Sequence, residues 1–204
     1  TACSSSLVAL HQACRSLNSK ECEMAVAGGV NLYFSDSGMI SLGAVGVLSP
    51  DGQCKTFDAN ANGFGRGEGC GTVLLKPLEK AMIDGDKVLA VIRSTVLNQD
   101  GKGTGMHAPN LNAQISLINS GLKLAQIEDP SEISYYETHG TGTVLGDAIE
   151  IEGIATIFGE NRSVDDPLHV GAIKSNFGHL EQTAGVAGLI KIIASLQTRK
   201  IFPN

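Results

Sequence analysis

The feature that most constrains the fold is the alternation, along the whole chain, of short apolar runs and longer stretches with helical periodicity. The short runs predict strands: MAVAGGV (24–30), CGTVLLKPL (70–78), VLAVIRSTVLNQ (88–99), ISYYETHG (133–140) and LHVGAIKSN (168–176). Apolar residues at helical spacing predict helices over residues 4–17, 111–125, 146–158 and 183–196. This alternation is typical of a single-domain α/β protein with a layered, parallel or mixed sheet.

A long segment, LSPDGQCKTFDANANGFGRGEG (48–69), lies between the first two predicted strands. It is dense in Gly, Asp and Asn, and shaped loops of this length usually carry function or cover a site. Its glycines lack the spacing of a dinucleotide-binding loop, and the chain contains neither a G-x-S-x-G motif nor a Walker A motif. The sequence therefore favours neither a nucleotide-binding protein nor a serine hydrolase.

Charge and apolar content exclude two classes of partner. The formal net charge is −6, without a basic stripe, which argues against nucleic acid. The most apolar stretch stops at Lys191 and is too short to span a bilayer, so no membrane is expected. The five cysteines include no C-x-x-C pair, which predicts reduced thiols and a cytoplasmic protein.

Cys3, in TACSSS, is the first candidate for chemistry. It directly precedes a predicted helix, whose unpaired N–H groups and positive dipole end favour the nucleophilic thiolate. The alternative is a buried structural cysteine. We keep that interpretation for the other cysteines, which are Cys14, Cys22, Cys54 and Cys70.

Two further motifs place a histidine after a predicted strand. ETHGTGT (137–143) contains His139, and KSNFGHLE (174–181) contains His179 together with Lys174. Ligands often bind at strand ends in α/β proteins. Lys174 is either a surface lysine or a cation that keeps the second imidazole neutral. The remaining histidines, His11, His107 and His169, are interpreted as ordinary surface or core residues.

A cysteine with two histidines permits three kinds of chemistry. A cysteine protease needs only one histidine. The long separations between the three residues lack the close ligand spacing usual for zinc, so no metal is expected. Two neutral imidazoles that donate to one thioester carbonyl, beside a cysteine that holds an acyl group, suit carbon–carbon bond formation.

TACSSS, the long loop, NQDG, ETHGTGT and KSNFGHLEQTAGVAGLIK, in this order, resemble the β-ketoacyl synthase (ketosynthase) domain of a type I polyketide synthase. The resemblance implies a thiolase-like layered α-β-α-β-α fold with two similar halves, and a homodimer with the strand at 24–30 near its interface. It also implies that residues 1–204 are a partial ketosynthase domain, without the N-terminal part and the extreme C-terminal part.

The resemblance assigns roles to the matching residues. Cys3 would hold the growing acyl chain, while His139 and His179 would bind the thioester carbonyl of a malonyl-type extender and promote loss of CO₂. Lys174 would support the histidines, and Thr141 and Thr143 would contact the phosphopantetheine of an acyl carrier protein. No cofactor bound by the domain itself is expected. The partners implied are the carrier protein, an acyltransferase and other domains of the same polypeptide.

Two alternatives stay open. The ketosynthase of a type I fatty acid synthase would share these motifs, and flanking domains would distinguish it. A non-catalytic scaffold version of the fold predicts a missing nucleophile or broken histidine loops, whereas Cys3, His139 and His179 are all present.

Overall fold

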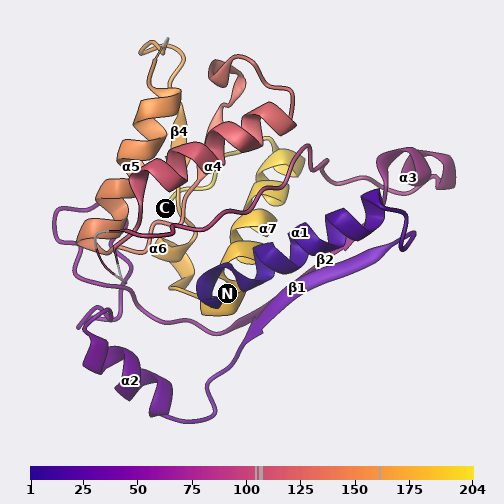
Figure 1. The fold of residues 1–204 in the computed structure, drawn as a ribbon. Coiled ribbons are helices and arrows are strands. Elements are labelled where there is room, and N and C mark those ends of the chain that lie inside the picture. The colour runs from indigo at the N-terminus through magenta and orange to yellow at the C-terminus, as the bar shows by residue number, and fades with distance from the viewer. Residues whose placement is uncertain (104, 106–107, 161) are drawn as a thin grey trace.

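The computed structural model describes residues 1–103, 105, 108–160 and 162–204 (Figure 1). The helices are α1 (Ser5–Asn18), α2 (Ser37–Val45), α3 (Leu78–Asp84), α4 (Leu111–Leu124), α5 (Val144–Phe158), α6 (Lys174–Phe177) and α7 (Ala184–Thr198). The strands are β1 (Ala25–Asn31), β2 (Gly69–Leu75), β3 (Tyr135–Glu137) and β4 (His169–Gly171). Three short 3₁₀ turns, η1 (Ala2–Ser4), η2 (Pro130–Glu132) and η3 (Glu181–Thr183), complete the described elements.

The strands form two separate pairs. β1 and β2 are antiparallel, with Ala25 opposite Leu75 and Asn31 opposite Gly69. β3 and β4 are parallel, and α5 lies in the crossover between them, as parallel neighbours require. The expectation of an α/β protein with mixed strand pairing is therefore confirmed.

One face of the β1–β2 pair is covered by α1 and α7 (Figure 1). Small residues allow this close packing. A Cβ on Gly29 would lie 2.7 Å from the Gln182 carbonyl oxygen, and one on Gly71 would lie 3.0 Å from Val186. The helices therefore approach the strands closely enough to bring the start of α1 and the start of α7 together.

The second pair carries the other half of the described fold. α4 packs against α5 (Figure 1), and β3, which pairs with β4, contacts α7. The core residues here include Ile154 and Phe158 of α5, which are 2% and 3% exposed, and Ala172 after β4, which is fully buried. This half positions the loops that follow β3 and β4.

The four helices predicted from periodicity are confirmed as α1, α4, α5 and α7. The strand predicted at 88–99 is wrong: none of these residues belongs to a regular element. The described residues supply no neighbouring strand for its backbone, and side chains hold the segment instead. Ser94 and Asn98, for example, donate to carbonyl oxygens of α4.

Other strand predictions are right in place but wrong in length. β2 ends before Pro77, which lacks an N–H for the ladder and precedes α3. β4 ends at Gly171, and Lys174, predicted in that strand, begins the one-turn helix α6. α2 was not predicted, because its apolar residues do not mark a single face; Ile40 is 70% exposed and Val45 56%.

None of the helices among the described residues combines the length and apolar character that crossing a bilayer requires.

Candidate active site

The predicted nucleophile and both predicted histidines meet at one place. Cys3 lies in η1, directly before α1, His139 follows β3, and His179 follows α6. The cysteine sulfur and one nitrogen of each imidazole all lie within 4.8 Å of one another. The two imidazole rings are 5.4 Å apart, edge to face. Residues at opposite ends of the chain therefore form a single cluster.

Hydrogen bonds fix the tautomer of His179. The backbone N–H of Glu181 donates to Nδ1 over 2.9 Å, so Nδ1 is an acceptor. Desolvation by burial, followed by the charge of Lys174, lowers the pKa of His179 to about 3, which leaves the ring neutral at pH 7. Its proton is therefore on Nε2, which donates to Cys3 Sγ over 3.1 Å. A protonated Nε2 also has no lone pair for a metal ion, so the cluster does not offer three metal ligands in this arrangement.

The long loop at 48–69 supports His179 from behind. The His179 N–H donates to the Gly65 carbonyl over 2.7 Å, and the Gly67 N–H donates back to the His179 carbonyl over 2.9 Å. The Phe64 ring lies 4.8 Å from the imidazole. His179 is 1% exposed, so neighbouring atoms surround it and restrict the movement of its imidazole.

The loop of His139 is held by two carboxylates that were not predicted from the sequence. Glu150 of α5 accepts the N–H groups of His139 and Gly140, over 2.6 and 2.8 Å. Asp147, also in α5, accepts the N–H groups of Gly142 and Phe57, over 3.1 and 2.8 Å. Their spacing of three residues in the helix directly after the histidine loop was the available signal, since it puts both on one helix face.

The surroundings also tune His139. Desolvation lowers the pKa of His139, and Lys174 and His179 act in the same direction, although the residue itself is exposed. Both imidazoles are therefore neutral at physiological pH. A neutral imidazole can donate its N–H to a carbonyl oxygen. A protonated imidazole would instead tend to form an ion pair with a carboxylate.

Lys174 lies in the same buried region and is 3% exposed. Burial lowers its pKa, while Glu150 and Cys3 raise it. After desolvation, its charge is the next cause that lowers the pKa of both histidines. The supporting role of Lys174 stays a prediction.

The thiol of Cys3 differs from expectation. Burial raises its pKa, and this effect exceeds the lowering by Lys174 and by the backbone hydrogen bond at the helix start. The expected lowering of the pKa at the helix start is therefore present, but burial outweighs it. The His179 Nε2–H lies where it can stabilise negative charge on the sulfur.

Thr141 and Thr143 belong to the loop between His139 and α5. Thr141 is 7% exposed, and its hydroxyl forms a 3.0 Å hydrogen bond with that of Thr143. Thr143 is the N-cap residue of α5. Contact of either residue with phosphopantetheine stays a prediction.

A buried ion pair, also not predicted from the sequence, lies under both histidine loops. Lys191 of α7 is 3.0 Å from Glu137, and each side chain is 5% exposed. Glu137 also accepts the N–H of Ile173, directly before Lys174, over 2.6 Å. Asn204 accepts the Ala172 N–H over 2.8 Å and contacts Lys191 at 3.3 Å. The end of β3 and the β4–α6 turn are thus tied to α7.

The remaining histidines lie elsewhere or are not described. His11 hydrogen-bonds Thr95, and His169 is exposed in β4. His107 lies outside the described residues.

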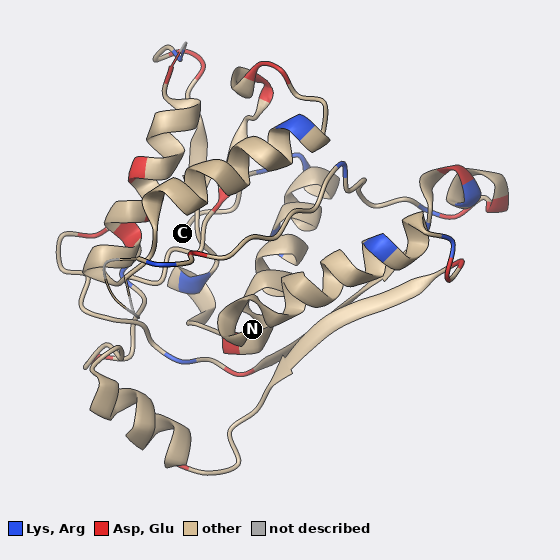
Figure 2. Cartoon of the chain, viewed as in Figure 1, with Lys and Arg blue, Asp and Glu red and all other residues tan. Residues whose placement is uncertain are grey.

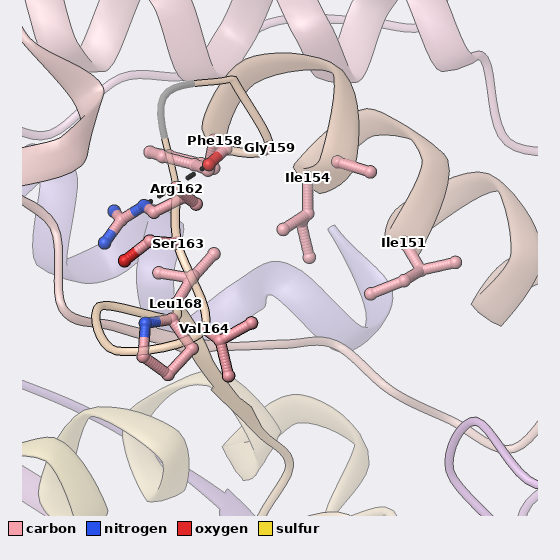
Figure 3. Close-up of a pocket in the computed structure, with 10 residues that line it drawn as sticks. Ile151, Ile154, Phe158, Gly159, Arg162, Ser163, Val164 and Leu168 are labelled. Atoms are coloured by element: carbon pink, nitrogen blue, oxygen red, sulfur yellow. Dashed lines mark hydrogen bonds between the residues drawn. The ribbon is translucent and has the colours of Figure 1, made fainter.

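An open pocket of about 480 Å³ at the C-terminal end of α5, lined by Ile154, Phe158 and Leu168 among others, contains none of the predicted site residues (Figure 3).

The chain matches two family models: "Beta-ketoacyl synthase, N-terminal domain" over residues 1–81 and "Beta-ketoacyl synthase, C-terminal domain" over residues 89–204. It is 50% identical, over all 204 residues, to one subunit of the phenolphthiocerol/phthiocerol polyketide synthase of Mycobacterium tuberculosis. It is 52% identical to another subunit of that synthase from the same species. The chain spans 11% of the length of each of these relatives.

Solved ketosynthase structures have the same fold. The ketosynthase from module 6 of the Bacillus subtilis bacillaene synthase superposes with a TM-score of 0.90 at 45% identity, covering 95% of this chain and 34% of that one. An oxazolomycin ketosynthase domain from Streptomyces albus gives a TM-score of 0.91 at 44% identity, covering 96% and 34%. The predicted thiolase-like fold, of which this chain holds part, is confirmed by these neighbours.

Proposed function

The chain belongs to the β-ketoacyl synthase family, and from this premise we propose that its site catalyses a decarboxylative Claisen condensation in polyketide biosynthesis. The proposed substrates are an acyl chain, held as a thioester on Cys3, and a malonyl-type extender on an acyl carrier protein. The product is a β-ketoacyl thioester longer by two backbone carbons.

The first half-reaction loads Cys3. The sulfur attacks the carbonyl carbon of the incoming acyl thioester, a new S–C bond forms, and the carrier thiol leaves with the proton from Cys3. The Nε2–H of His179, 3.1 Å from the sulfur, stabilises the negative charge that develops there.

The second half-reaction uses both imidazoles as donors. His139 and His179 donate to the thioester carbonyl of the extender, and loss of CO₂ leaves an enolate whose oxygen they stabilise. The enolate carbon attacks the acyl carbonyl on Cys3, a C–C bond forms and the C–S bond breaks. The Cys3 sulfur leaves as a thiolate and takes up a proton from solvent. Desolvation, together with the charge of Lys174, lowers the pKa of both imidazoles and keeps them neutral. In this proposal no metal or redox cofactor takes part, and the phosphopantetheine belongs to the carrier protein.

One observation carries the proposal: the Nε2–H tautomer of His179, which is fixed by the Glu181 N–H and directed at Cys3. A general base for a protease needs a lone pair at this nitrogen, whereas an enolate-stabilising site needs a proton there.

Acylation of Cys3 tests the proposal. The full-length protein is incubated with an acyl thioester and its mass is measured. We expect one acyl adduct on the wild type and none on the Cys3→Ala protein. A wild-type protein that forms no adduct would contradict the proposal.

The two alternatives have weaker support. The relatives at 50% and 52% identity are polyketide synthase subunits, which favours polyketide over fatty acid synthesis. A scaffold role would leave unexplained why three reactive side chains converge within 4.8 Å.

The partners follow from the same proposal. They are an acyl carrier protein, an acyltransferase and further domains of one polypeptide, in the cytoplasm, where the five free thiols would stay reduced. A second copy of the chain would pack on the outer face of β1 and β2. Val26, Val30 and Leu74 are 70%, 56% and 68% exposed there, and neither strand carries a charged residue (Figure 2).

A further inference from the structure

We propose that Arg66 is a positioning residue for His179: by holding Glu181, it maintains the backbone conformation that fixes the Nε2–H tautomer of the imidazole. This inference rests on the proposed function, because it assigns a supporting group to a histidine that acts in decarboxylation.

The conformation of Glu181 is unusual. Its φ is 46°, in the left-handed region that residues with a side chain seldom adopt. A flip of the peptide between Leu180 and Glu181 would return this φ to negative values, as the two common β-turn types differ by such a flip. The flip would also turn the Glu181 N–H away from His179 Nδ1, which it now meets at 2.9 Å. The strained conformation and the hydrogen bond to the imidazole therefore belong together.

Strained residues persist where surrounding contacts hold them. Arg66 Nε donates to Glu181 Oε1 over 2.5 Å, and the two side chains are only 7% and 16% exposed. The Arg66 guanidinium also lies 4.0 Å from the centre of the Tyr33 ring, which limits its movement. The side chain of Glu181 is thus anchored to a group that is itself fixed.

Arg66 is also placed by the backbone of His179. Its two neighbours, Gly65 and Gly67, exchange hydrogen bonds with the His179 backbone, over 2.7 and 2.9 Å. The Arg66 side chain then reaches past His179 to Glu181. Backbone and side chain of the long loop therefore hold the segment 179–181 at both ends.

Loss of the Glu181 N–H would change what His179 can do. With Nδ1 unpaired, the neutral ring is free to carry its proton on Nδ1, and Nε2 then presents a lone pair to the site. In that tautomer it cannot donate to the extender carbonyl. The position of His179 would be retained while its donor is lost, so kcat would fall with little change in KM.

The test measures decarboxylation of a malonyl group on the carrier protein by the full-length protein. For Arg66→Met, we expect kcat to fall about tenfold or more, with KM within about twofold, since loss of one such donor costs roughly 10²–10³ in rate. Because glycine adopts a positive φ without strain, the double variant Arg66→Met/Glu181→Gly should recover kcat to within about threefold of the wild type.

Two controls separate conformation from charge and from general stability. Arg66→Met/Glu181→Gln removes the unpaired carboxylate but keeps the strain, and it should stay impaired. Arg66→Met/Arg199→Gly relieves another residue with positive φ (55°), at the end of α7, and it should also stay impaired.

The outcomes are distinct. A wild type that does not decarboxylate the extender overturns the proposed function itself. With an active wild type, the inference is overturned if Arg66→Met keeps full activity, if Glu181→Gly fails to rescue it, or if Glu181→Gln or Arg199→Gly rescues it equally well.

Discussion

The Nε2 of His179 lies 3.1 Å from the Sγ of Cys3, although 176 positions separate the two residues in the chain. The contact joins the start of α1 to the loop after α6, and the packing of α1 and α7 on the small residues of β1 and β2 makes it possible. In the proposed reaction, one imidazole proton would thus serve the sulfur in the first half-reaction and the extender carbonyl in the second.

Replacing His179 tests this division of roles. In His179→Ala, we expect decarboxylation of the malonyl carrier protein to fall by roughly 10²–10³, since one preorganised donor is lost. Acylation of Cys3 should fall less, to within about tenfold of the wild type, because the sulfur loses one hydrogen bond, worth about 1 kcal/mol, and the imidazole does not act as its base. Mass measurement of the acyl adduct and quantification of released CO₂ give the two rates separately. Equal losses in both would show that the roles are not divided in this way.

The depressed pKa of His179 predicts a pH effect on stability. The folded protein holds this histidine neutral down to about pH 3, whereas the unfolded chain takes up the proton near pH 6.5. The unfolded state therefore binds more protons in this window, so stability falls as the pH drops below 6.5. Compared with the His179→Gln protein, the wild type should lose up to about 1.4 kcal/mol in its free energy of unfolding for each pH unit below this point.

Denaturant unfolding of the wild type and of the His179→Gln protein, each at pH 7 and pH 5, measures this difference in the free energy of unfolding. The neutral amide of the glutamine variant serves as the control for all other titrating groups. A wild type and variant that lose stability in parallel would contradict the assigned pKa.

Glu150 should matter for the His139 loop through its two backbone hydrogen bonds. Glu150→Ala leaves the N–H groups of His139 and Gly140 without their acceptor, and hydrogen bonds to a charged group contribute about 1.5–3 kcal/mol. We expect kcat for decarboxylation to fall at least about tenfold. Steady-state kinetics test this, with Glu152→Ala on the exposed side of α5 as a control that should stay near wild type.

The ion pair of Lys191 and Glu137 should support the fold under both histidine loops. Lys191→Met leaves Glu137 buried without its cation, which should cost about 3–5 kcal/mol in the free energy of unfolding. The double variant Lys191→Met/Glu137→Gln should recover at least half of that loss. Lys80→Met, which breaks an exposed pair with Asp84, should cost far less stability. A Lys191→Met protein as stable as the Lys80→Met protein would contradict this assignment.

Cys3, His139, Lys174 and His179 were predictable because each lies in a motif at a helix start or strand end. Glu137 and Arg66 were not, because a single charged residue in a strand or loop looks like any solvated side chain. For Glu150, the spacing from Asp147 indicated only a shared helix face. Their importance appears only when the fold brings backbone N–H groups or an opposite charge to them.

The fold shows the same limit. The helices were predicted from periodicity, which is a local property, whereas a strand also needs a neighbour. The apolar run at 88–99 has strand-like composition, but no described strand pairs with it, and it runs instead along α4, held by side chains such as Ser94. The raised pKa of Cys3 likewise depends on burial, which a sequence motif alone does not give.

The most direct test of the central claim is the ratio of condensation to decarboxylation in the Cys3→Ala protein. The full-length protein receives an acyl thioester and a malonyl carrier protein, and β-ketoacyl product and CO₂ are measured together. The wild type should release one CO₂ for each β-ketoacyl product. Cys3→Ala should form no product yet still release CO₂, because His139 and His179 remain in place. A Cys3→Ala protein that still forms the β-ketoacyl product would contradict the account.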